Sequence, residues 1–271
     1  MVRFFLRNPN LEEIKIRKNV SAETAQLGPL FKLSMFGRDI YIVSSAELLD
    51  ELCDERRFVK KVSQTLEVLR YVSHDGLFTA HTHEHAWGVA HRILTPHLGP
   101  MGIQSMYNEM YDIASQMVIK WARQGPNQTI DASADFTRLT LDALALCAMD
   151  MRFNSFYHDK MHPFMDSLVE IMLDANVAPR RTFIEKWWDK EPEKRFKRNT
   201  ALMRKIAREI LDHRRSNWTD RKDLLSAMLF SKDPKTGERM SEESIIDNLI
   251  TLLVAGTILV GSSVEDLLQV R

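Results

Sequence analysis

The longest run of apolar positions in the chain extends from Ser241 to Val260. After its first turn, apolar residues occupy every side of a helical projection, so no polar stripe is left to face water. Ser241 is a favourable N-cap, and Glu242 and Glu243 place negative charge where the helix dipole favours it. The pattern predicts a helix at the centre of a domain, with an apolar surface formed by Ile245, Ile246, Leu249, Ile250, Leu252, Leu253 and Val254.

The same run must be compared with a membrane span, because no charged residue occurs from Asn248 to Val264. A span requires about 20 strongly apolar residues. This run is interrupted by the polar or small residues Asn248, Thr251, Gly256, Thr257 and Gly261. A buried core helix is therefore favoured, and no stable membrane span is expected.

Two small residues, Ala255 and Gly256, lie midway along this helix. Small residues in a buried helix most often allow a neighbouring backbone to approach closely. They also allow a flat cofactor or a diatomic ligand to lie against the helix. Both interpretations remain open from the pattern alone.

The rest of the pattern is helical except near the N-terminus. Phe31–Phe36 and Asp39–Val43 are strand-like runs that flank Gly37 and predict a hairpin. Apolar residues at helical spacing then predict helices after an N-cap at Ser45, over 58–72, and along 106–121, 136–146, 163–175 and 196–213. Thr129–Ala132 is a short strand candidate. The predicted fold class is mainly α, with a small N-terminal β-hairpin.

Composition narrows the class of protein. Apolar residues make up 44% of the 271 positions, which is enough for a substantial core. Lys and Arg together number 37, as do Asp and Glu, so charge gives no reason to expect nucleic acid or an acidic membrane as partner. Basic residues are dense over 180–222, but acidic residues are interleaved with them, which favours a solvated helix face.

The two cysteines, Cys53 and Cys147, lie in apolar helical patterns without metal-like spacing. They are interpreted as buried free thiols in a reducing compartment. The first residues of the chain hold too short an apolar run for a signal peptide. A cytoplasmic location is expected.

Six of the nine histidines fall between His74 and His97. The alternation of His81, His83 and His85 would place three imidazoles on one side of a strand, as a zinc site can require. No strand pattern surrounds them, and the H-E-x-x-H motif is not completed because position 87 is Trp. Exposed histidines in a loop entering a helix are favoured, and no metal site is predicted from protein ligands.

Several stretches in one order resemble the cytochrome P-450 (haem-thiolate monooxygenase) family. The resemblance is closest to the self-sufficient fatty-acid hydroxylases, which are fused to a flavin reductase. It is carried by Asp75–Pro96, Leu139–Leu144, Arg152–Tyr157, Asp223–Leu225, Lys232–Glu238 and Leu249–Gly256. It implies a P-450-like helical fold and haem (iron protoporphyrin) as cofactor. It also implies NADPH, FAD and FMN acting through a reductase.

The resemblance implies haem contacts at particular residues. Trp87 and His91, one helical turn apart, match the family's donors to the haem propionates. Lys60 matches a further charged contact. Ala255 and Gly256 match the groove in which dioxygen lies.

The resemblance also implies a substrate channel. Phe78 matches an aromatic side chain over the haem face, and Arg38 matches a cation at the channel mouth that holds a fatty acid's carboxylate. The tyrosine that assists this cation in the family is replaced here by Ile42, with Tyr41 one position earlier. The other channel-lining candidates are apolar: Leu66, Leu69 and Val72.

The resemblance ends at Gly256, where the family's acid and threonine for proton delivery do not follow. The later E-x-x-R helix and the loop bearing the iron-ligating cysteine are not found either, and neither Cys53 nor Cys147 matches the axial ligand. The chain is interpreted as a single partial haem-monooxygenase domain over 1–271, in which residues 1–20 and 257–271 match the family poorly. It is expected to be a truncated fatty-acid monooxygenase, inactive alone. The resemblance implies that later segments of the family cover the central helix, so Leu252 and Leu253 are expected to stay open to water here. Two alternatives remain: a non-catalytic helical protein that binds an apolar ligand, and a fragment from an incorrect gene model.

Overall fold

The computed structural model describes residues 28–268, apart from 36–37, 55, 63, 126 and 178–187. The side chains of 33–35, 38–39, 64–65, 175–177 and 258–268 also lie outside the described part. The chain forms two compact units, Met1–Lys61 and Val62–Arg271.

The first unit contains the predicted hairpin. Strands β1 (Leu30–Met35) and β2 (Arg38–Val43) pair antiparallel, with Leu30 opposite Val43. Helix α2 (Ala46–Leu52) follows, and its predicted cap is confirmed because the Ser45 hydroxyl accepts a hydrogen bond from the Leu48 N–H at 3.2 Å. None of the residues of α2 is buried.

Cys53 ends this helix and is exposed, so its prediction as a buried thiol was wrong. The apolar spacing that suggested burial belongs to a seven-residue helix with no buried side chain. Cys147 is buried, as predicted.

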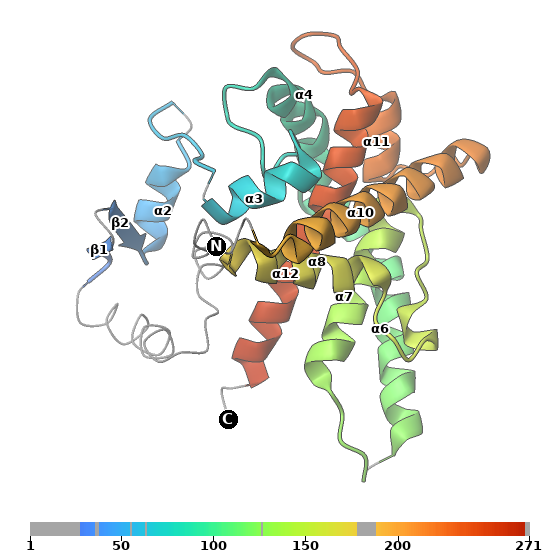
Figure 1. The fold of residues 1–271 in the computed structure, drawn as a ribbon. Coiled ribbons are helices and arrows are strands. Elements are labelled where there is room, and N and C mark those ends of the chain that lie inside the picture. Colours follow the sequence, from blue (N-terminus) through green and yellow to red (C-terminus); the bar gives the residue numbers. More distant parts are fainter. Residues whose placement is uncertain are drawn as a thin grey trace. The chain divides into compact units, whose positions relative to one another are not determined.

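The second unit is helical throughout, which confirms the predicted mainly α class (Figure 1). In Figure 1, α6 and α7 run side by side and α10 crosses in front of the bundle. The elements of the second unit, in chain order, are α3 (Gln64–Ser73), α4 (His85–Leu94), η2 (Thr95–Leu98), α5 (Pro100–Ser105), α6 (Tyr107–Gln124), α7 (Ala132–Met149), η3 (Ser155–Tyr157), α8 (Pro163–Val177), α10 (Glu191–Ser216), α11 (Leu224–Phe230) and α12 (Glu242–Leu268).

Helix α12 is the predicted central helix. The Ser241 hydroxyl accepts a hydrogen bond from the Ser244 N–H at 3.2 Å, and the helix continues to Leu268, beyond the predicted end at Val260. Most of its apolar residues are buried against α7, α10, α3, α11 and α4. Leu253 is fully buried and Leu252 half-buried, so the expectation that both face water was wrong. No helix in the described ranges is both long enough and apolar enough to cross a membrane.

Two other boundaries differ from the prediction. Helix α3 begins at Gln64 rather than at residue 58, and residues 58–62 are not helical. The β-branched residues Val59 and Val62, which flank two lysines, lower the helix propensity of this stretch. The strand candidate Thr129–Ala132 does not form, because the Asp131 carboxylate accepts a hydrogen bond from the Ala134 N–H at 3.0 Å and caps α7.

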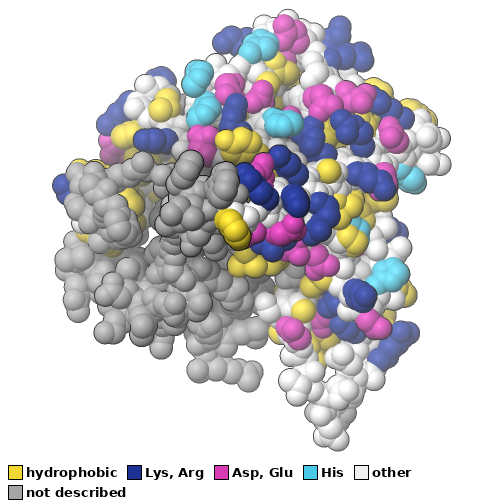
Figure 2. All heavy atoms as spheres, viewed as in Figure 1, with side chains coloured by type: hydrophobic (Ala, Val, Ile, Leu, Met, Phe, Trp, Pro, Cys, Tyr) yellow, Lys and Arg dark blue, Asp and Glu magenta, His cyan; other side chains and the backbone are white. Residues whose placement is uncertain are grey.

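Helix α10 carries the dense basic residues noted in the sequence. Figure 2 shows Lys and Arg interleaved with Asp and Glu on this face of the molecule. Lys197 pairs with Glu193 at 2.7 Å, and Arg215 pairs with Glu242 at 2.8 Å. The inward face of α10 is apolar and buried at Met203, Ala207, Ile210 and Leu211, as predicted.

Candidate functional site

Helix α4 presents Trp87 and His91 on one face. Their rings are stacked, with centroids 4.7 Å apart and planes inclined by 23°. Both side chains are half-buried, whereas Val89, Ala90, Ile93 and Leu94 turn into the core. Two rings that can each donate an N–H hydrogen bond therefore lie together, one helical turn apart.

A small apolar hollow lies between α3, the loop that follows it, and α12. Three of the five predicted substrate residues, Leu69, Val72 and Phe78, line this hollow. Its volume is about 10 Å³, the space of a single water molecule. Leu66 is half-buried and packs against the core, but it does not line the hollow. The other lining residues are Ser73, Thr79, Ile250, Thr251 and Val254.

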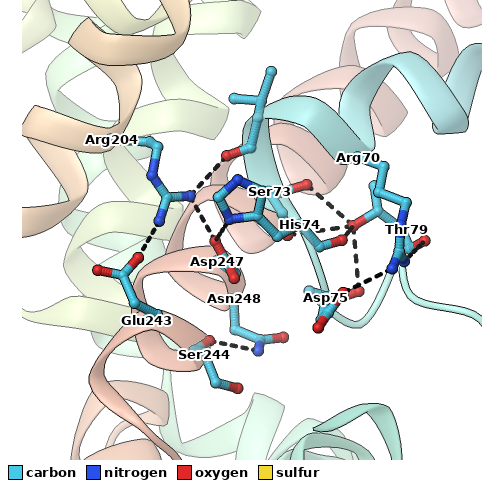
Figure 3. Close-up of polar contacts among 12 residues, drawn as sticks. Arg70, Ser73, His74, Asp75, Thr79, Arg204, Glu243, Ser244, Asp247 and Asn248 are labelled. Carbon is cyan, nitrogen blue, oxygen red and sulfur yellow. Dashed lines mark hydrogen bonds and ion pairs between the residues drawn. The ribbon is translucent and has the colours of Figure 1, made fainter. Parts of the chain in front are cut away.

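The loop after α3 is bonded to both α10 and α12 (Figure 3). Arg204 of α10 donates hydrogen bonds to the Val72 carbonyl at 2.9 Å and to the Asp247 carboxylate at 2.6 Å, and it also pairs with Glu243. His74 lies 3.2 Å from the same Asp247 carboxylate. The backbone of His74 has a φ of +31°, which allows the chain to turn sharply out of α3.

Asp247 is a buried carboxyl group at the centre of these contacts. Burial raises the pKa of Asp247 above its ordinary value, and the hydrogen bond from Arg204 opposes that effect. Such a group is costly to bury without its partner. Asp247 and Arg204 therefore hold the start of the loop against α12.

The remainder of the loop is held by two further side chains, those of Asn248 and Arg70. The Asn248 amide oxygen accepts a hydrogen bond from the Leu77 N–H at 3.0 Å. The Arg70 guanidinium donates to the Thr79 carbonyl at 3.1 Å and pairs with Glu84. Phe78 therefore lies between two residues whose backbones are each bonded to a side chain of a neighbouring helix.

Gly256 contacts α7 at close range. A Cβ atom added at Gly256 would overlap the side chain of Leu144. The space where a Gly256 side chain would lie is therefore occupied by Leu144 of α7. For Gly256, this favours the interpretation that a small residue allows two helices to pack closely. Ala255 is half-buried, next to the hollow-lining Val254.

Two of the predicted site residues belong to the first unit. Lys60 is exposed there. Arg38 begins β2, and its side chain lies outside the described part. Their predicted contacts with haem and substrate remain predictions.

Neither cysteine fits an iron ligand. A ligating sulfur must be deprotonated. The Cys147 thiol is buried on α7 and donates to the Met106 carbonyl at 3.7 Å, and burial raises its pKa to about 11. Cys53 is exposed at the end of α2 in the first unit. The described residues hold no group of three or more His, Cys, Asp or Glu placed to bind a metal ion.

Sequence reasoning did not assign the α12 side of the hollow to the site. Ile250, Thr251 and Val254 share one helix face at i, i+1 and i+4, so the helical period could have identified them from Ala255. No local pattern marks Arg204 or Asn248, because their partners lie 43 and 171 residues away.

Comparison with known proteins assigns the family. The chain is 49% identical over 229 residues to a bifunctional cytochrome P450/NADPH–P450 reductase of Aspergillus oryzae, and 50% identical over 232 residues to one of Acremonium egyptiacum. It is 50% identical over 230 residues to a self-sufficient cytochrome P450 monooxygenase of Aspergillus niger. Each comparison covers 84% of this chain, which spans about a fifth of the length of these relatives (21% or 22%).

The family model described as Cytochrome P450 matches residues 3–258, nearly the whole described part of the chain. The matched residues include both the stacked pair on α4 and the hollow between α3 and α12. The chain therefore belongs to the cytochrome P450 family, as the resemblance of its sequence predicted.

Proposed function

We propose that this chain is part of a haem-dependent monooxygenase that hydroxylates a fatty acid or a similar amphiphile. The observation that carries the proposal is that Leu69, Val72 and Phe78 converge on one apolar hollow against α12. An apolar site of this kind suits a hydrocarbon tail. Similarity to a bifunctional cytochrome P450/NADPH–P450 reductase and to a self-sufficient monooxygenase supports electron supply by a fused reductase, with NADPH, FAD and FMN, in the whole protein.

The residues of this chain fit one end of a haem. Trp87 and His91 offer two N–H donors side by side, which suits the two propionate carboxylates. Lys60 is proposed as a third donor. When bound, haem supplies the iron chemistry that activates dioxygen. Neither Cys53 nor Cys147 is proposed as the thiolate ligand, because neither lies in a stretch resembling the family's ligand loop and burial raises the pKa of the Cys147 thiol.

Arg38 and Phe78 are proposed to bind different parts of the substrate. Arg38 is proposed to pair with the carboxylate of the fatty acid, because a cation at the mouth of an apolar channel gives that group a partner. The ring of Phe78 is proposed to limit how far the tail advances, since Phe78 lines the hollow together with Val254. The hollow holds only about one water here, so a fatty-acid tail requires Phe78 or its neighbours to move.

The test is a chimera that joins this chain to the remaining segment of one of its relatives. Phe78→Ala is expected to change which carbon of a saturated fatty acid is hydroxylated, whereas Phe153→Ala, which removes a ring stacked on His162 instead, is not. Arg38→Ala is expected to weaken fatty-acid binding by about 1 kcal/mol, as for a partly exposed charge-assisted contact. Unchanged products and unchanged affinity would remove the support for both roles.

A further inference from the structure

Asn248 connects the central helix to the loop that carries Phe78. Its side chain is fully buried. Its amide oxygen accepts from the Leu77 N–H at 3.0 Å, and its amide nitrogen donates to the Ser244 carbonyl at 2.7 Å. Because Ser244 lies one turn earlier on α12, the second bond orients the amide so that its oxygen faces the loop.

The neighbouring residue, Gly76, lets the loop backbone pack close against α12. A Cβ atom at Gly76 would overlap the Thr251 hydroxyl and would lie 2.9 Å from the Asp247 carbonyl oxygen. Only glycine allows the loop backbone this close to the helix. The Leu77 N–H therefore reaches Asn248 at one register of loop and helix.

The residue after Phe78, Thr79, is fixed by hydrogen bonds that do not involve Asn248. The Thr79 hydroxyl donates to the His74 carbonyl at 2.8 Å, and the Arg70 guanidinium donates to the Thr79 carbonyl at 3.1 Å. Both anchors of Thr79 lie on α3 or in the loop itself. Asn248 thus ties the backbone beside Phe78 to α12.

We propose that Asn248 is a positioning residue that holds the Phe78 ring in the hollow and thereby selects the carbon that reacts. This selection rests on the function proposed above. The positioning itself rests only on contacts within the chain. Without the Asn248 oxygen, this hydrogen bond between α12 and the Leu77 N–H is lost, and the loop segment that carries Phe78 moves relative to α12.

The first experiment uses the whole chain without haem or fatty acid. Its phenylalanines are replaced by 4-fluorophenylalanine, and the ¹⁹F signal of Phe78 is identified by its loss in Phe78→Leu. Asn248→Leu is expected to shift and broaden this signal and to speed amide exchange at Leu77 about tenfold, the loss of one net hydrogen bond. Asn248→Gln keeps both the acceptor oxygen and the donor nitrogen and is expected to retain more of the original signal than Asn248→Leu does.

Asn199→Leu is the matched control. It makes the same change at another buried asparagine, which bonds to Glu170 at 2.6 Å on the α8–α10 side of the unit. This control is expected to lower the melting temperature without moving the Phe78 signal. A purely structural role for Asn248 predicts the same outcome for both variants. A Phe78 signal unmoved by Asn248→Leu would overturn the positioning role.

The second experiment repeats Asn248→Leu in the chimera with the remaining segment of a relative. The distribution of hydroxylated carbons is expected to change in the direction seen for Phe78→Ala, and Asn248→Gln, which keeps both the acceptor and the donor, is expected to shift it back toward that of the unaltered chain. A moved Phe78 signal with unchanged products would overturn the selection. A chimera of the unaltered chain that hydroxylates no fatty acid would overturn the proposed function, while the spectroscopic result still decides the positioning role.

Discussion

The backbone of Gly76 approaches α12 so closely that a Cβ atom there would lie 2.9 Å from the Asp247 carbonyl oxygen. Backbone atoms on both sides set this distance, since the Ser73 carbonyl oxygen would lie 3.0 Å from the same Cβ. Rotation of a side chain cannot relieve such contacts. The loop after α3 can therefore pack against the central helix only with glycine at this position.

Gly76→Ala is expected to lower the free energy of unfolding by about 1–3 kcal/mol, the usual cost of forcing extra volume into a packed interior. Urea denaturation measures the change. Gly99→Ala is the control, because a Cβ atom there would meet only the Pro96 oxygen at 3.5 Å and the φ of −70° suits alanine. Equal stability of Gly76→Ala and the unaltered chain would show that the loop packs differently.

Arg204→Met is expected to destabilise the chain by about 3 kcal/mol, because it leaves the Asp247 carboxylate buried without its partner. The Arg204 and Asp247 side chains are only 13% and 5% exposed. Arg208→Met removes another arginine of α10 that binds Glu243, but this one is 47% exposed. The control is expected to cost less than about 1 kcal/mol. Equal costs for the two variants would contradict a buried role for Arg204.

Asp233 is expected to make the chain sensitive to acid. Its carboxylate accepts two hydrogen bonds from Arg92, at 2.6 and 2.7 Å, and these hold the pKa of Asp233 well below its ordinary value. A carboxyl group whose pKa is lowered by folding stabilises the fold above its unfolded pKa, near 4, and this contribution is lost as pH falls further.

The melting temperature is therefore expected to fall below about pH 4, and Asp233→Asn is expected to make that decline shallower. Thermal unfolding followed by circular dichroism from pH 6 to pH 2 tests both statements. The same acid dependence in the variant and in the unaltered chain would contradict the assignment to Asp233.

The two thiols are expected to differ in reactivity. Cys53 is exposed, whereas Cys147 is buried and its pKa is raised to about 11, so little of it is thiolate at neutral pH. Ellman's reagent is expected to modify one thiol rapidly in the folded chain and the second only in denaturant. Cys53→Ser should remove the rapid reaction. A rapid reaction that persists in this variant would mean that Cys147 is accessible.

The sequence by itself determined the helical class, the hairpin and most of the helix centres. These features depend on local periods and caps, such as the serine caps at Ser45 and Ser241, which act within a few residues. The pairing of Trp87 with His91 was equally predictable, because residues four apart meet on one helix face. Family membership followed from several ordered matches along the chain.

The tertiary structure alone decided which residues meet across the chain. Arg204, Asp247 and Val72 come together from three elements, and Asn248 meets Leu77 across 171 residues. Neither contact has a local signature, because hydrogen bonds between distant segments depend on how helices pack. Which apolar side chains are buried also depended on how the helices pack. The apolar spacing was equally regular around Cys53 and Leu253, yet only Leu253 lies on a helix covered on several sides by its neighbours.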